Sequence, residues 1–300
     1  MSEPTIPVSF GWMRDLPSIR DYTPENPEIE PLLVKVKGAM APDSPRATPA
    51  SMDLRAWCSQ IEDQGNLGSC TANAGVGLVE YYQRRAFGKH IDASRLFLYK
   101  TTRDLMGVTG DTGAYLRTVM EALVVFGVPP EQYWKYDISK FDVEPSAFLY
   151  AFAQGYQALK YYRLDPSGTT KPALLNAIKT NLASGLPSIF GFTVYSSYTQ
   201  ASAANKGAIP YPTAGEKSVG GHAVMAVGYD DGKKIKNANP GATATTGALL
   251  IRNSWGTGWG DGGYGWLPYE YVLRGLAVDW WALLSAEWVA TDNFGLAPPQ

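Results

Sequence analysis

The hydrophobic pattern changes from helical to β-rich along this chain, and that change constrains the fold more than any other feature. Apolar residues recur at helical spacing in four stretches, which are 69–87, 94–99, 115–126 and 171–183. Four short β-rich runs bounded by glycine and proline lie at 187–195, 222–229, 248–252 and 263–267. A helical part followed by a β-rich part predicts an α+β protein of two lobes with a cleft between them.

The N-terminal segment differs from the rest of the chain. Residues 1–50 contain nine prolines, and proline removes backbone donors and disfavours long helices and central strands. The same stretch carries Phe10 and Trp12, so we expect an extended arm with an anchored patch at Gly11–Tyr22; a flexible leader is the alternative. The chain is therefore divided into an arm at 1–50, a helical lobe at 51–165 and a β-rich lobe at 166–300.

The composition excludes several classes of protein. The 300 residues carry a formal net charge of -2 and no block rich in lysine or arginine, which argues against nucleic-acid or anionic-membrane partners. No apolar run approaches the roughly 20 residues that cross a bilayer, and the first ten residues do not read as a secretory signal. We expect a cytoplasmic monomer, or a protein exported without a recognisable signal. Two cysteines, Cys58 and Cys70, are few for a secreted protein, although one bridge between them is the alternative.

The segment that leads to Cys70 favours a reactive thiol. Ser69 is expected to cap the helix that begins here, and a cysteine at a helix N-terminus feels the positive end of the helix dipole, which favours thiolate. The preceding glycines let the backbone turn sharply and expose the sulfur. The Cys70 amide and the side-chain amide of Gln64 could then stabilise a developing oxyanion.

Two later segments supply partners for such a thiol. His222 opens an apolar strand, whereas the other histidine, His90, lies in an expected exposed turn, so His222 is the better candidate for a base. Asn253 ends a strand, and its amide oxygen can accept the His222 Nδ1–H and orient the ring. Trp255 could cover that bond. When each segment is considered by itself, the alternatives are a structural role for His222 and a packed β-turn at Asn253 and Trp255.

The order Gln-x5-Cys, Gly-His-Ala-Val and Asn-Ser-Trp-Gly resembles the pattern of the papain and cathepsin family of cysteine peptidases. The resemblance implies the papain-like two-lobed fold, with a helical left lobe, an antiparallel β-barrel right lobe and the active-site cleft between them. It also implies hydrolysis of peptide bonds through a thiolate and an acyl-enzyme, with no metal or cofactor. The implied catalytic residues are Cys70 as nucleophile, Gln64 in the oxyanion hole, His222 as base and Asn253 as its orienting group.

The resemblance further implies a set of substrate-binding residues. They are Gly113, Ala114, Tyr115, Leu116, Gly221, Ala223 and Trp255. Gly113 falls where the family has a Gly-Gly pair that binds the substrate backbone, and Ala114 departs from the second glycine. Tyr115, Leu116 and Ala223 fall on walls of the S2 pocket, which implies an apolar P2 side chain.

The arm is the main departure from the family pattern. It lies where family members carry an inhibitory prosegment, but it is too short and too rich in proline to be the usual helical one. It resembles the brief leader of some bacterial members, so we expect a bacterial zymogen whose own arm limits access to the cleft. A cysteine acyl-transferase or deamidase on the same scaffold, and a non-catalytic peptide-binding protein, are the alternatives.

Overall fold

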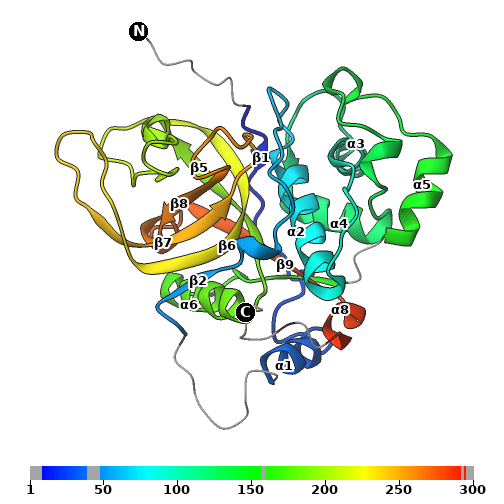
Figure 1. Ribbon diagram of the computed structural model, residues 1–300, viewed down its shortest axis with the longest axis horizontal. Helices are drawn as coiled ribbons and strands as arrows, with labels where there is room; N and C mark the ends of the chain where they lie inside the picture. The colour runs from blue at the N-terminus through cyan, green and yellow to red at the C-terminus, as the bar shows by residue number, and fades with distance from the viewer. Residues whose placement is uncertain (1–8, 39–47, 157–159, 292–293, 295–300) are drawn as a thin grey trace.

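The computed structural model describes residues 9–38, 48–156, 160–291 and 294. These residues form two lobes that lie side by side, one built mainly of helices and the other mainly of sheet (Figure 1). The α+β class and the two-lobed arrangement are therefore as predicted. None of the helices in the described part combines the length and apolarity that a bilayer span requires.

The helical lobe is organised around α2 (Cys70–Phe87), which packs against the sheet lobe as well as against its neighbouring helices. The other helices of this lobe are α3 (Arg95–Met106), α4 (Leu116–Val125) and α5 (Ala147–Ala153). α2 ends at Gly88, whose φ of 70° is a left-handed conformation that glycine adopts without strain. Ser94 caps α3 by accepting a hydrogen bond from the Phe97 amide at 3.2 Å.

The sheet lobe contains one seven-stranded antiparallel sheet. In spatial order its strands are β4 (Lys160–Arg163), β9 (Ala277–Leu284), β5 (Ser188–Tyr195), β6 (Ser218–Ile235), β7 (Thr245–Arg252) and β8 (Tyr264–Pro268), with β2 (Ser51–Asp53) paired to β6. Within the described residues β4 and β8 do not pair with each other, so the sheet is not a closed barrel. α6 (Lys171–Ala183), predicted at these same residues, packs against β6.

The remaining helices and 3₁₀ turns are short. They are α1 (Glu30–Gly38), α7 (Tyr269–Leu273), α8 (Ala286–Ala290) and 3₁₀ turns at Arg55–Trp57, Glu131–Tyr133, Ile138–Lys140, Gln154–Tyr156 and Ser196–Gln200. α1 forms in the proline-rich segment because its Pro31 lies in the first turn, where a missing N–H breaks no helical hydrogen bond. α8 packs on α1 and α2, so the C-terminal part of the chain returns to the helical lobe (Figure 1).

Some strands were not predicted from the sequence. All eight residues of β9 are buried, so its sequence lacks the alternation that marks a half-exposed strand. β2 and β4 fall within residues 51–165 but belong to the sheet, because they pair with β6 and β9 respectively. The chain therefore crosses between the lobes at both ends of that segment.

The arm runs between the two lobes and is dark blue in Figure 1. Its strand β1 (Trp12–Met13) pairs in parallel with β3 (Ala114–Tyr115) of the helical lobe. On its other side β1 contacts β6 of the sheet lobe. The described part of the arm thus lies in contact with both lobes.

The aromatic core of the sheet lobe gives a test of this architecture. The Trp280 side chain is fully buried and stacks on Phe190 with ring centroids 3.9 Å apart. Trp280→Ala should lower the free energy of unfolding by about 3–5 kcal/mol, because it leaves a large cavity. Urea denaturation measures this, with the exposed Leu105→Ala as control, expected to change stability by less than about 1 kcal/mol. Equal losses for the two variants would contradict the buried stack.

Candidate active site

Cys70 is the first residue of α2, and its side chain is fully buried. The turn before it is held by Asp111, whose Oδ1 accepts a hydrogen bond from the Gly68 amide at 3.0 Å. Ser69 occupies the N-cap position, but its side chain makes no cap bond; its hydroxyl lies 2.6 Å from the Tyr136 hydroxyl instead. The predicted side-chain cap is therefore wrong, and Tyr136 fixes this serine.

His222 and Asn253 are brought together by the pairing of β6 with β7. His222 lies within β6, Asn253 directly follows β7, and both side chains are buried. His222 Nε2 is 2.8 Å from Asn253 Oδ1, so the expectation that Nδ1 would contact the asparagine is corrected. Asn253 Oδ1 also accepts from the Ser254 amide at 2.8 Å, which identifies it as the acceptor. Nε2 therefore carries the proton, and Nδ1 keeps its lone pair.

The surroundings of His222 leave that lone pair available. His222 Nδ1 is buried and has no hydrogen-bond partner among the described residues. Trp255 stacks on the imidazole, with ring centroids 4.6 Å apart and planes 24° apart. The stacked indole shields the ring from water, and a buried nitrogen with a free lone pair can accept a proton.

Gln64 is held in place by its side-chain amide. Its Oε1 accepts a hydrogen bond from the Ser254 hydroxyl at 2.6 Å, and its Nε2 donates to the Leu67 carbonyl at 2.9 Å. The same nitrogen donates to the Ser9 carbonyl of the arm at 3.0 Å. The amide thus already binds a peptide carbonyl, which is the chemistry expected of an oxyanion-hole donor.

The arm contacts most of the predicted substrate-binding residues. Gly11 O accepts from the Ala114 amide at 2.8 Å, and a Cβ added at Gly113 would lie 2.2 Å from the same oxygen. Met13 pairs with Tyr115. A Cβ added at Gly221 would lie 2.7 Å from the Trp12 ring.

The other predicted binding residues lie beside the catalytic candidates or in the core. Phe10 of the arm contacts Trp255 edge-on, with ring centroids 6.3 Å apart. The Ala223 amide faces the Cys70 thiol. Leu116 is fully buried at the start of α4 and packs in the hydrophobic core. The structure therefore brings the predicted residues to one cleft, with Leu116 beneath its surface.

Burial under the arm sets the protonation of the candidate pair. Loss of water raises the pKa of Cys70 to about 11, although the amides of Ala223 and Gly11 lower it in part. Loss of water also lowers the pKa of His222 to about 4, which the bond to Asn253 only partly offsets. These pKa values favour a neutral thiol and a neutral imidazole at pH 7, and the thiolate expected from the sequence stays a prediction.

Several residues that shape the site were missed from the sequence. Ser254 lies inside the Asn-Ser-Trp-Gly motif, so the motif itself could have indicated it. Asp111 lies two residues before Gly113, so that predicted stretch could have indicated it, whereas Tyr136 lies far from the motifs and no spacing pointed to it. Within the described residues, no group of three or more His, Cys, Asp or Glu side chains could hold a metal ion, and Cys58 and Cys70 are both free thiols.

Known proteins match this chain over most of its length. The family model described as papain family cysteine protease matches residues 48–272. An uncharacterized peptidase C1-like protein of Acanthamoeba polyphaga mimivirus is 32% identical, over 98% of this chain and 92% of its own. Xylellain, a cysteine protease from Xylella fastidiosa, is 31% identical with a TM-score of 0.69, over 95% of this chain and 99% of its own.

A more distant match is cathepsin K of Gallus gallus, which is 27% identical over 74% of this chain and 60% of its own. The matched proteins thus come from a virus, a bacterium and a bird. The expected bacterial origin therefore stays a prediction.

Histidine titration tests the covered state directly. The side-chain ¹⁵N and ¹H signals of His222 should titrate with a midpoint near pH 4 in the full chain, because burial disfavours the imidazolium. His90 is partly exposed and serves as the internal reference. Replacing it with glutamine assigns the two sets of signals. A His222 midpoint at or above 6.5 would show that water or a Cys70 thiolate stabilises the imidazolium, and it would contradict the neutral pair.

Proposed function

The chain belongs to the papain family of cysteine proteases, and from that premise we propose that it hydrolyses peptide bonds at Cys70 and that its own arm restrains this activity. The observation that carries the proposal is the hydrogen bond between His222 Nε2 and Asn253, which leaves His222 Nδ1 free to take a proton. The ring is thus oriented as a base, beside a helix that begins with a cysteine.

The chemistry follows from these positions once water and substrate reach the cleft. Cys70 loses its proton to His222 Nδ1, and the sulfur attacks a peptide carbonyl carbon. The carbonyl oxygen becomes an oxyanion that the Gln64 Nε2–H and the Cys70 amide stabilise, each worth about 3 kcal/mol in such sites. His222 then protonates the leaving amine, and a water molecule that it activates releases the acyl group from sulfur.

The way in which the arm binds supports a restraint of the active site in which the arm itself is not cleaved. The carbonyl on Gln64 Nε2 is that of Ser9, but the group that faces the thiol is the Gly11 amide, two residues further along. In a productive complex the carbonyl held by Gln64 would be the one that the sulfur attacks. The arm therefore occupies the Gln64 donor with a carbonyl that lies two residues before the amide acting on the thiol, an arrangement that fits binding without cleavage.

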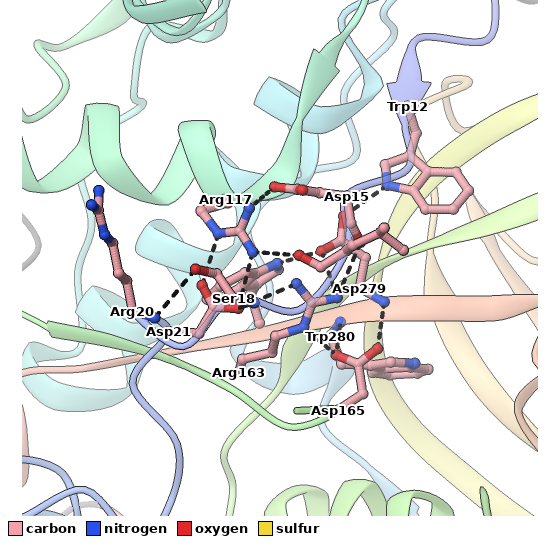
Figure 2. A network of polar contacts seen from close by, with 12 residues as sticks. Trp12, Asp15, Ser18, Arg20, Asp21, Arg117, Arg163, Asp165, Asp279 and Trp280 are labelled. Carbon is pink, nitrogen blue, oxygen red and sulfur yellow. Dashed lines mark hydrogen bonds and ion pairs between the residues drawn. The ribbon is translucent and has the colours of Figure 1, made fainter. Parts of the chain in front are cut away.

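Ion pairs fasten the arm beyond the cleft. Figure 2 shows Arg117 of α4 bound to two carboxylates of the arm, Asp15 and Asp21. Arg117 also donates to the Leu16 carbonyl at 2.7 Å. Asp21 is buried by these contacts, and Arg163 of β4 lies 3.5 Å from it. Removing one partner of a buried ion pair leaves an unpaired buried charge, which costs free energy. These ion pairs therefore hold the arm on the lobes.

The residues around Trp12 support an apolar preference next to the cleaved bond. The indole lies against the backbone of β5 at Gly191 and of β6 at Gly221, in the part of the cleft adjacent to Gly11 and the thiol. An apolar P2 side chain would take the place of the indole when the arm leaves.

A single methyl group in the arm tests the restraint in the full chain. A Cβ at Gly11 would lie 1.8 Å from the Gly68 carbonyl oxygen, so Gly11→Ala should displace the arm. We expect peptide hydrolysis and alkylation of Cys70 by iodoacetamide at pH 7 to rise by about tenfold or more, because the sulfur becomes hydrated. The matched control is Gly155→Ala, where a Cβ meets nothing within 4 Å. No change in Gly11→Ala relative to this control would argue against restraint by the arm.

The roles of the three candidates are tested in the Gly11→Ala background. Cys70→Ala should abolish hydrolysis, and His222→Ala should lower kcat/KM by about 10⁴-fold or more. Asn253→Ala should cost less than His222→Ala, because asparagine orients the base and transfers no proton. Circular dichroism checks that each variant is folded. A larger loss for Asn253→Ala than for His222→Ala would contradict the assigned roles, and formation of amide products with an added amine would indicate acyl transfer.

A further inference from the structure

The Trp12 side chain occupies a pocket that two glycines keep open. A Cβ added at Gly191 would lie 1.8 Å from Trp12 Cε2, and one added at Gly221 would lie 2.7 Å from Cε3. Gly191 belongs to β5 and Gly221 to β6, which are neighbours in the sheet, and the two residues lie two rungs apart, with the Phe192–His222 pair between them. The indole therefore lies flat on bare backbone, and the space it fills suits a large planar side chain.

The carboxylate of Asp279 lies at the end of this pocket. Trp12 Nε1 donates to Asp279 Oδ2 at 3.1 Å, and the Asp279 side chain, on β9, is fully buried. Asp279 has a φ of 64°, a left-handed conformation that is uncommon outside glycine. Its amide donates to Asp165 Oδ2 at 2.8 Å and its Oδ1 accepts from Trp281 Nε1 at 2.8 Å. The carboxylate is thus fixed with Oδ2 pointing at the indole.

One arginine partly offsets the charge of Asp279. Arg163 lies 3.3 Å from Asp279 and 2.9 Å from Asp165, and it also approaches Asp21 of the arm (Figure 2). When the arm leaves, Asp21 leaves with it, and Arg117 and Arg163 then face fewer carboxylates than before. Arg163 then keeps the carboxylates of Asp165 and Asp279 as partners, and a neutral N–H donor would bond Asp279 Oδ2 without changing the charge of this group.

We propose that, with the arm displaced, this pocket selects a tryptophan side chain of the substrate, and that Asp279 is the residue that determines this specificity. The inference rests on the proposed function and refines its apolar preference: flat glycine walls select a large ring, and the buried acceptor selects a ring that carries an N–H. An isostere without the N–H leaves a buried carboxylate oxygen unpaired, which is the costly case for a polar group.

The test uses the full chain with Gly11→Ala and peptides acetyl-X-Gly with a fluorogenic amide leaving group. X is tryptophan, its isostere 3-benzothienylalanine, leucine or arginine. The tryptophan peptide should exceed the isostere in kcat/KM by about tenfold or more, since one hydrogen bond to a buried carboxylate separates them. Equal values within twofold, or a higher value for arginine, would overturn the proposal.

A binding measurement separates this proposal from the proposed function. With Cys70→Ala added to Gly11→Ala, calorimetry of the same peptides gives their affinities without turnover, and the same ratio is expected. If the active variant cleaves none of the peptides, the hydrolytic function fails, and the affinities still decide the pocket.

Two variants of Asp279 complete the design, and both tolerate its left-handed backbone. Asp279→Gly should reduce the preference for tryptophan over the isostere to less than twofold. Asp279→Asn keeps an acceptor oxygen and should retain part of the preference. A preference that Asp279→Gly leaves unchanged would show that the glycine walls alone select the ring.

Discussion

The covered state depends on direct contact between the backbones of three glycines. Gly11 of the arm lies against Gly68, in the turn before Cys70, and against Gly113, before β3. No side chain fits between them, so the arm lies as close to the floor of the cleft as a backbone can. Only from that position do Ser9 and Trp12 bond to Gln64 and Asp279.

The same close approach sets the electrostatics of the site. Burial raises the pKa of the Cys70 thiol to about 11 and lowers the pKa of the His222 imidazole to about 4, which favours the neutral form of both groups. The hydrogen bonds from Asn253 to His222 and from Ser254 to Gln64 do not involve the arm, since Asn253 and Ser254 belong to the sheet lobe. In the proposed mechanism the lobes arrange the groups, and hydration controls their ionisation.

The motifs predicted the parts of the site that are local in sequence. The residues on α2, β6 and the segment after β7 came from short patterns, because each pattern reports its own turn or strand end. The predicted helix at 171–183 was correct because the periodicity of its residues is a local property. The arm's path could not be predicted, because it depends on the absence of side chains at Gly68, Gly113, Gly191 and Gly221, which lie far apart in sequence.

The contribution of β9 was missed for a related reason. Asp279 interrupts an apolar run, and in the sequence it reads as a charge that should face solvent. Its buried carboxylate is paired with Arg163 of β4 and accepts hydrogen bonds from Trp12 of the arm and from Trp281 of its own strand. A buried charge is explained by its partners, and partners are a property of the fold.

Under the proposed function, the arm and the substrate use one set of contacts, which would couple restraint to specificity. Gln64, the glycine walls and Asp279 hold the arm, and each of them lies where a substrate would have to bind. A change at Asp279 that altered the choice of substrate would also weaken the bond to Trp12. Under the proposed function, a change in the pocket therefore also changes how the arm binds, and Trp12 indicates the side-chain chemistry that the pocket would accept from a substrate.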